Sequence, residues 1–402
     1  MYLESLHLSQ FRCFELSEFA FAGRATGIVG VNGSGKTALL EACSVVLGAL
    51  VAQIVPITNP RPVGFDDERG GVEGPRQPIE IFSVLQIEGV RCALAIRHFE
   101  NSSEMALSFE LSEFLHVVRR HKALHPLLAH YRTGRLWFGE PGAPPDDSGW
   151  QRGYIGCLDP SVSERAWINW IKNGSEGLKR DHREQLASLL KHLSRFLGAG
   201  ILEIGTAHEL TYSVYGRRVP LRMVADGVRS ILTIIIDLVW RASTLNPQLS
   251  LEEAIRIPGI ILIDEIDLHL HPAWQRRAIT LLRSTFPNVH LIVTTHSPFV
   301  IKELPKSALV NLDGRSVAND GSIEDISEEV LGVALPQRSL RQQSMIEAAR
   351  EYFQALSSGT IDEAELLKLK RALDLALLPF ADDVGVLSFL QLEEMAARSH
   401  KR

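Results

Sequence analysis

The sequence predicts an α/β fold in which helices cover a parallel or mixed sheet. One observation is the order strand, glycine-rich turn and helix within residues 25–50. A second is a pair of fully apolar runs, "IPGIILIDEID" and "NVHLIVTTH", which are typical of strands covered on both faces. The chain has 402 residues, 45% of them hydrophobic and 22% charged, an ordinary globular composition. That length suits one large domain or a few lobes.

The first hundred residues alternate between strand patterns, one helix and one long loop. Residues 2–30 alternate apolar and polar positions, which predicts short strands, and a helix follows the glycine-rich turn. Residues 59–78 are dense in Pro, Gly and charge, so we expect a loop there. Residues 79–99 form a predicted antiparallel hairpin that turns at Glu88-Gly89.

The middle of the chain predicts a helical lobe of about residues 110–200 inserted into the head. Ser112 to Arg132 is helical and basic in character, and residues 139–150 are loop-like. Residues 163–174 and 181–198 are amphipathic, and the second of these helices carries a stripe of Leu186, Leu189, Leu190, Leu193 and Leu197. Residues 201–221 return to a strand pattern.

The sequence predicts two regions, an N-terminal head at residues 1–322 and a C-terminal helical region at residues 323–402. In that region Thr360 and Glu363 have the spacing of a capping box. A leucine stripe then follows at Leu366, Leu369, Leu373 and Leu377.

Composition excludes several classes of protein. A net charge of -6 argues against a generic DNA-coating protein, so any nucleic-acid contact requires a local basic patch. The four cysteines are scattered, without a CxxC pair, as expected of reduced thiols. No signal-peptide pattern opens the chain, and the apolar run at 231–240 is shorter than the roughly 20 residues of a membrane span. We therefore expect a cytoplasmic protein with no membrane contact.

The strongest motif is "GVNGSGKT", which fits G-x-x-x-x-G-K-[ST] between an apolar strand and a helix. Glycines let backbone N–H groups point at phosphates, and the helix N-terminus adds partial positive charge. Lys36 suits the β and γ phosphates, and the Thr37 hydroxyl suits Mg²⁺. The alternative is a glycine-rich turn without a ligand. The predicted contacts with ATP come from Gly30, Asn32, Gly33, Ser34, Gly35, Lys36 and Thr37.

Acidic residues and a histidine end the two apolar strands. Asp264 and Glu265 follow "IILI", where both can face a crevice at the sheet edge. Asp264 would then support Mg²⁺, and Glu265 would polarise the attacking water. His296 ends the next strand and could sense the γ phosphate. The alternatives are a pair of surface acids and a structural histidine.

These motifs, in this order, resemble the ABC-type ATPase heads of the RecF, SMC and OLD-like group. In that family a signature segment binds the γ phosphate held by the other subunit, which implies a homodimer or a higher homo-oligomer. Here the matching residues are Asp226, Gly227 and Arg229, with Ala225 where the family usually has Ser. Such a role would explain why the polar turn Asp226-Gly227 opens an apolar helix. Asp267 matches the D-loop of the family.

A closer resemblance is to compact prokaryotic AAA-type ATPases of antiviral defence, such as those of the Septu (PtuA) and retron systems. It extends over nearly the whole chain and includes "FRCFE", "YRTGRLW", "VADGVRSIL", "DEIDLHLHPAWQRR" and "THSPFVI". It implies an ATPase that controls a separate nuclease subunit. This chain shows no TOPRIM or HNH pattern of its own and no long coiled-coil arm.

Several alternatives stay open at the level of sequence. The function could instead be that of a RecF-like DNA-repair or DNA-structure-binding ATPase, or of a scaffold that binds ATP and scarcely hydrolyses it. No clear Q-loop can be identified, although Gln53 and Gln86 are candidates, and Arg12 could reach the nucleotide. DNA or RNA contact would use a basic stretch, predicted as helical, of His116, Arg119, Arg120, His121, Lys122, His125, His130, Arg132 and Arg135.

Overall fold

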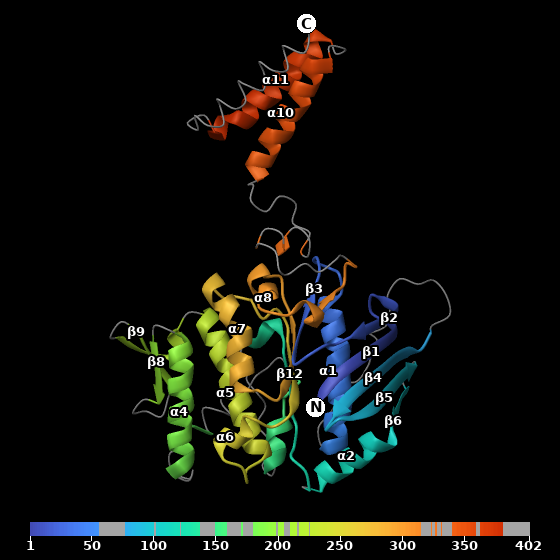
Figure 1. Cartoon of the computed structure of the whole chain (residues 1–402), viewed down its shortest axis with the longest axis vertical. Coiled ribbons are helices and arrows are strands. Elements are labelled where there is room, and N and C mark those ends of the chain that lie inside the picture. The colour runs from blue at the N-terminus through green and yellow to red at the C-terminus, as the bar shows by residue number, and fades with distance from the viewer. Residues whose placement is uncertain are drawn as a thin grey trace. The chain divides into compact units, whose positions relative to one another are not determined.

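The computed structural model divides into two compact units, Met1–Gly332 and Val333–Arg402. The described residues are 1–55, 77–99, 102–120, 122–136, 149–158, 170–171, 180–197, 200–204, 210–214, 217–224, 226–314, 323, 326–327, 331, 340–358 and 362–380. The division falls at 332/333, against a predicted boundary at 322/323. Each unit is described by itself below (Figure 1).

A parallel five-stranded sheet forms the centre of the first unit, in the order β13-β3-β12-β11-β7. Its strands are β3 (Ala25–Val29), β7 (Leu127–Tyr131), β11 (Gly259–Ile263), β12 (Val289–Thr294) and β13 (Leu309–Asn311). Every residue of β3, β7, β11 and β12 is buried, which explains their unbroken apolar character. The parallel sheet predicted from the sequence is confirmed.

Helices cover both faces of this sheet. The helix α1 (Lys36–Ile54) contacts β7, β11 and β12 on one face, and α5 (Asp226–Leu245) contacts β7. Figure 1 shows α5 and α7 on the side of β12 opposite to α1. Three further helices follow α5 in this unit: α6 (Leu251–Ala254), α7 (Pro272–Thr285) and α8 (Pro298–Lys302).

A second sheet, antiparallel, lies beyond α1 in the order β2-β1-β4-β5-β6. Its strands are β1 (Tyr2–Phe11), β2 (Phe14–Ala20), β4 (Ile79–Ile87), β5 (Val90–Phe99) and β6 (Ser102–Leu107). The hairpin predicted at Glu88-Gly89 is present, with both residues at positive φ, 52° and 86°. The helix α2 (Phe109–Arg119) follows β6 and begins at an N-cap, Ser108, whose side chain accepts from the backbone N–H of Leu111.

The predicted helical lobe at about 110–200 is wrong in one respect, because a segment near its start belongs to the parallel sheet. Residues 127–131, expected to continue a basic helix, form the buried strand β7. The amphipathic helix α4 (Arg180–Leu197) is present and buries Leu186, Leu190 and Leu193. It packs on a small antiparallel sheet of β8 (Gly200–Ile204), β9 (Leu210–Val214) and β10 (Arg217–Pro220).

Short 3₁₀ turns connect several of these elements. In the first unit they are η2 (Thr133–Leu136), η3 (Trp150–Tyr154), η4 (Leu221–Met223) and η5 (Lys306–Ala308). The turn η3 contacts α5 and brings Tyr154 into the core, where its hydroxyl donates to the Pro126 carbonyl at 2.8 Å. The predicted helix at 163–174 lies almost entirely outside the described residues.

One described helix, α1, is long and apolar enough to cross a membrane by length and composition alone. However, 78% of its apolar window is buried inside the protein. Because α1 is enclosed between the two sheets, we interpret it as the core helix of the head. The apolar run at residues 231–240, predicted from the sequence to be too short for a membrane span, lies within α5.

The second unit contains a helical hairpin of α10 (Leu340–Ser358) and α11 (Glu363–Leu377), followed by η6 (Leu378–Phe380). Leu373 of the predicted stripe is buried against Tyr352 and Leu356, and Leu366, Leu369 and Leu377 pack beside it. The N-cap of α11 is Asp362, without a side-chain cap hydrogen bond, so the predicted capping position at Thr360 is wrong. Thr360 itself lies outside the described residues.

Candidate functional site

The predicted phosphate loop, Gly30–Thr37, begins where β3 ends and finishes in the first turn of α1. Gly30, Gly33 and Gly35 have φ values of 152°, 84° and 99°, a region that L side chains rarely adopt. A Cβ on Gly35 would lie 2.6 Å from the Cys13 sulfur, so the turn between β1 and β2 packs against the loop. The sequence therefore has glycine where backbone geometry and close packing require it.

The side chains of the loop fit a bound polyphosphate. Lys36 folds back and donates from Nζ to the carbonyl oxygens of Gly30 and Val31, at 2.9 and 2.7 Å. Burial lowers the pKa of Lys36, while the carboxylates of Asp313, Asp264, Glu265 and Asp267 oppose that shift. The Ser34 hydroxyl oxygen is buried and has no hydrogen-bond partner within the described part of the chain. A phosphate oxygen would accept the hydrogen bond that the Ser34 hydroxyl lacks.

The end of β11 brings Asp264 next to this loop. The Thr37 hydroxyl donates to Asp264 Oδ2 at 3.3 Å, although 227 residues separate the two. The other oxygen, Asp264 Oδ1, accepts from the Thr294 hydroxyl at 2.5 Å. Hydroxyl and carboxylate oxygens are the ligands that Mg²⁺ prefers, so Thr37 and Asp264 fit the predicted metal role.

Glu265 follows Asp264 at the point where β11 ends. Its backbone N–H donates to the Thr294 hydroxyl at 2.7 Å, and its φ of 45° is left-handed. Non-glycine residues in that region store about 1 kcal/mol or more of strain, and they cluster at functional sites. The turn lets Asp264 and Glu265 both reach the sheet edge, which an extended strand would prevent.

Asp267 and His296 come together on the next turn of chain. Asp267 Oδ1 accepts from the Thr295 hydroxyl and, at 3.3 Å, from the backbone N–H of His296. Thr295 directly follows Thr294, the last residue of β12, so Asp267 is hydrogen-bonded to the end of that strand. His296 is half-buried at this edge. Ser297 extends the connection, because its hydroxyl lies 2.6 Å from Gln275 Oε1 of α7.

Asp313 belongs to this site and was missed from the sequence. Its Oδ2 accepts from the backbone N–H of Val31 at 2.7 Å, and among charged groups it has the largest effect on the pKa of Lys36. The residue comes two positions after β13, beside the strand that carries the loop. Its one sequence signal was an acidic residue at the end of a strand, in "VNLDG".

The signature segment starts α5, with Gly227 buried and Arg229 half-buried. A Cβ on Gly227 would collide with the backbone oxygen of His269 and would lie 3.1 Å from its carbonyl carbon. The signature glycine of this chain therefore packs on the segment just after Asp267. Ala225 and the Asp226 side chain lie outside what the structure describes.

The structure places neither Q-loop candidate among the residues of the candidate site. Gln53 is in the last turn of α1, and its carbonyl accepts from Arg119 at 2.5 Å. Gln86 is in the antiparallel sheet, where its amide donates to Glu4 at 3.0 Å. Arg12 lies in the turn between β1 and β2 that packs on Gly35, with its guanidinium 5.7 Å from the centre of the Phe11 ring. A contact from Arg12 to the nucleotide stays a prediction.

The two histidines of "DLHLHP" lie in different surroundings. His271 is the N-cap of α7 and accepts from the backbone N–H of Ala273 at 3.3 Å. His269 is exposed and has a φ of 63°. Among the described residues, no group of three or more His, Cys, Asp or Glu side chains could hold a metal ion.

The basic stretch does not form one helical surface, which corrects the sequence interpretation. His125 and His130 are 2% and 1% exposed, and His130 Nδ1 lies 3.0 Å from the Ser44 hydroxyl in the core. Arg132 pairs with Glu41 at 2.9 Å. His121 and the Arg135 side chain lie outside the described residues. The stretch is divided between the end of α2 and the buried strand β7.

Comparison with known families and proteins is consistent with this geometry. Residues 157–302 match the family described as "AAA domain, putative AbiEii toxin, Type IV TA system", and residues 5–66 match an AAA domain. The second match contains the phosphate loop, and the first contains the signature segment, Asp264, Glu265 and His296.

The chain is 25% identical to the retron Vc95 probable ATPase of Vibrio cholerae serotype O1 biovar El Tor, over 74% of this chain and 71% of that protein. It is 33% identical to the Septu protein PtuA of Bacillus thuringiensis, over 30% of this chain and 33% of PtuA. A solved SMC head bound to the C-winged helix domain of ScpA is 19% identical, covers 75% of this chain and 91% of its own, and has a TM-score of 0.48. The resemblance to retron and Septu ATPases predicted from the motifs is confirmed.

Proposed function

We propose that this protein is an ATPase that closes on a second copy of itself around ATP and thereby controls a separate effector, a nuclease, in prokaryotic antiviral defence. The observation that carries the ATPase part is the hydrogen-bonded series Thr37, Asp264 and Thr294, with Glu265 beside it. Relatives named as probable ATPases support the same activity. The chain is an ATPase on these grounds.

The reaction is phosphoryl transfer from ATP to water. Lys36 would release the Gly30 and Val31 carbonyls and donate to the β and γ phosphates. Bound Mg²⁺, held by Thr37 and Asp264, would neutralise charge on the phosphate oxygens. Glu265 would accept the proton of the attacking water, and His296 would donate a hydrogen bond at the γ end. Asp264 already accepts from Thr37 and Thr294, so it is fixed before the nucleotide arrives.

Pairing of two copies is argued from the signature segment. Asp226, Gly227 and Arg229 open a 20-residue helix whose first N–H groups have no partner within the helix. Such a helix start attracts phosphate, and it would serve the ATP held by the other copy. Because Gly227 packs on the chain after Asp267, a change at the ATP-binding edge reaches the signature segment through one backbone contact.

The nuclease partner is proposed from the relatives, which carry retron and Septu names. The alternative, a RecF-like ATPase that acts on DNA, would need a continuous basic surface. Among the described residues of the basic stretch, two histidines are buried and Arg132 is paired with Glu41. These observations favour a protein partner, although DNA or RNA contact stays a prediction.

ATP turnover tests the enzyme part. Wild type should hydrolyse ATP with Mg²⁺, Glu265→Gln should bind ATP and lose about 100-fold or more in rate, and Lys36→Ala should lose binding. Light scattering with the Glu265→Gln form should show ATP-dependent pairing that Lys36→Ala lacks. Equal rates in wild type and Glu265→Gln would leave only a nucleotide-sensing scaffold.

A mixing experiment tests the shared site. Lys36→Ala and Arg229→Ala subunits are each expected to be inactive, whereas the mixture should regain one competent site in each mixed pair. Gly227 is a poor choice for this experiment, because any side chain there strikes His269. No recovery on mixing would argue against the composite site.

The partner is identified by purifying tagged Glu265→Gln protein with ATP from the native host. A stoichiometric nuclease would support the effector role. Recovery of only the protein itself and DNA would favour the RecF-like alternative, and steep salt dependence of DNA binding would then confirm it.

A further inference from the structure

The carboxyl end of β7 lies directly beside Asp264. In the parallel pairing of β7 with β11, Tyr131 is opposite Ile263, and the backbone N–H of Asp264 donates to the Tyr131 carbonyl at 2.8 Å. The next residue, Arg132, therefore leaves the sheet next to the predicted metal-binding carboxylate. Ligands of parallel α/β sheets bind at this edge, beyond the carboxyl ends of the strands.

The side chain of Arg132 is held by the helix that carries the phosphate loop. Its Nη2 donates to Glu41 Oε2 at 2.9 Å, and the Glu41 side chain is 7% exposed. Glu41 lies one helical turn after Thr37 in α1. The ion pair is therefore next to the Thr37–Asp264 pair, and the Arg132 side chain keeps 28% of its surface exposed. This position is not that of a pair fully enclosed in the core.

The negative charges at this edge of the sheet would be offset by a cation such as the Arg132 guanidinium. Lys36 is influenced by the carboxylates of Asp313, Asp264, Glu265 and Asp267, and the phosphates of ATP would add further negative charge. Thr37 and Asp264 would hold the Mg²⁺ ion, which would neutralise charge at the β and γ phosphates of ATP. A group adjacent to Asp264 is therefore at the γ-phosphate end.

We propose that Arg132, oriented by Glu41, is a phosphate-binding residue of this site that favours ATP over ADP. A guanidinium has several N–H donors in one plane, so one edge can bond Glu41 while another donates to a γ-phosphate oxygen. Arg132 thus lies at the end of β7, whereas the Q-loop candidates Gln53 and Gln86 lie in α1 and β4. The inference rests on the proposed ATP-binding function and assigns a discriminating contact within it.

Equilibrium binding tests the proposal without using turnover. In the Glu265→Gln form, the dissociation constants of ATP and ADP are measured by calorimetry with Mg²⁺, with and without Arg132→Gln. We expect ATP binding to weaken by about ten-fold or more and ADP binding by less than about three-fold, as for loss of one charged hydrogen bond. Arg132→Lys should recover only part of the ATP affinity, because it lacks the planar fork.

Two further variants separate this role from simple support of the fold. Arg132→Gln removes the cation that pairs with the buried Glu41 carboxylate. The double variant Arg132→Gln/Glu41→Gln removes that charge as well and should keep the same loss of ATP preference. As a control, Arg97→Gln breaks the exposed ion pair with Glu80 and should change the affinity for neither ATP nor ADP. Equal losses for ATP and ADP, or no loss, would overturn the assignment of Arg132 while leaving the ATPase intact. A wild type that binds neither nucleotide would overturn the proposed function itself.

Discussion

Gly227 of the signature segment lies in direct contact with the backbone of His269, in the loop that follows Glu265 and Asp267. The glycine is buried, and its φ is not positive, so the requirement here is space and not backbone freedom. The structure thus joins the start of α5 to the edge of the sheet where ATP hydrolysis is proposed.

Gly227→Ala should therefore destabilise the protein, by about 1–3 kcal/mol, because the new methyl group must displace the His269–Leu270 backbone. Chemical denaturation measures the change. Gly134→Ala is the matched control, since a Cβ there meets nothing within 4 Å and the φ of Gly134 is not positive. Equal stability of the two variants would show that the loop yields to the methyl group at little cost.

Glu265→Gly should separate stability from activity. Glycine accepts the φ of 45° without the strain of a side chain, so the free energy of unfolding should be unchanged or higher by up to about 1 kcal/mol. ATP hydrolysis should fall by about 100-fold or more, because the proposed general base is lost. Thermal melting and phosphate release measure the two effects. A strong loss of stability would mean that the Glu265 side chain supports the fold.

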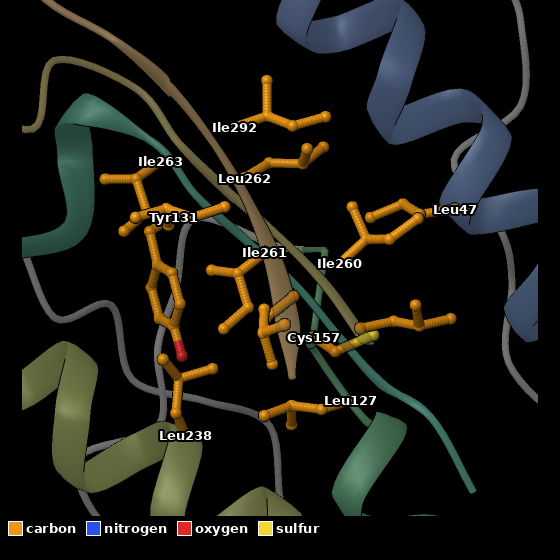
Figure 2. Packing of buried hydrophobic residues seen from close by; sticks show 14 of the residues in the cluster. Leu47, Leu127, Tyr131, Cys157, Leu238, Ile260, Ile261, Leu262, Ile263 and Ile292 are labelled. Carbon is orange, nitrogen blue, oxygen red and sulfur yellow. The ribbon is translucent and has the colours of Figure 1, made fainter. Parts of the chain in front are cut away.

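A buried cluster ties the signature helix to the sheet. Asp237 Oδ2 accepts from the Tyr131 hydroxyl and from Arg241 Nε, each at 2.7 Å, and Arg241 Nη1 donates to the carbonyls of Gly153 and Ile155 at 2.9 and 3.0 Å. Figure 2 shows the Tyr131 ring beside Ile261, with its hydroxyl directed toward the helix that carries Leu238. The acidic residue in this apolar helix thus anchors α5 to β7.

Tyr131→Phe should cost about 1–2 kcal/mol, and Asp237→Ala about 3–5 kcal/mol, because the second change leaves the Arg241 charge buried without its carboxylate. Asp237→Leu combined with Arg241→Met should recover much of that loss. As a control, Arg256→Ala removes an exposed pair with Glu252 and should cost less than about 1 kcal/mol. Denaturation of each variant decides, and a small effect of Asp237→Ala would contradict the assignment.

Acid should weaken the fold through His290. The ring is 1% exposed, its Nδ1 accepts from the backbone N–H of Leu3 at 3.2 Å, and burial lowers its pKa from 6.5 to about 3. The unfolded chain therefore binds a proton that the folded chain refuses, and stability is lost as pH falls from about 6.5 toward about 3. Between pH 7 and pH 4.5, wild type should lose about 2–3 kcal/mol more than His290→Gln. Parallel losses would exclude His290 as the cause.

The motifs whose residues are contiguous could be predicted fully. Gly30 to Thr37 requires one strand, one turn and one helix, and each is encoded locally by apolar periodicity and glycine. Asp264 and His296 followed from the same logic, because apolar strands of a parallel sheet end at one edge. Local sequence therefore predicted the sheet and the strand ends at which the candidate site residues lie.

Residues 127–131 show where that logic failed. The segment is short and is preceded by basic residues, so periodicity could not distinguish the end of a helix from a buried strand. Burial beside β11 made the segment a strand, and this pairing placed Arg132 beside Asp264. Asp313 was missed for a similar reason, since its contact with Val31 depends on the pairing of β13 with β3.

The sequence by itself determined the chemistry at each strand end: a phosphate loop, a carboxylate pair and a histidine, each encoded within a few residues. Tertiary structure alone decided which distant groups join them, namely Thr294 on Asp264, Asp313 on the phosphate loop, Arg132 beside Asp264 and His269 on Gly227. The physical reason is that strand order and helix packing are set by burial of the whole core. No local pattern records which strand will be the neighbour of another.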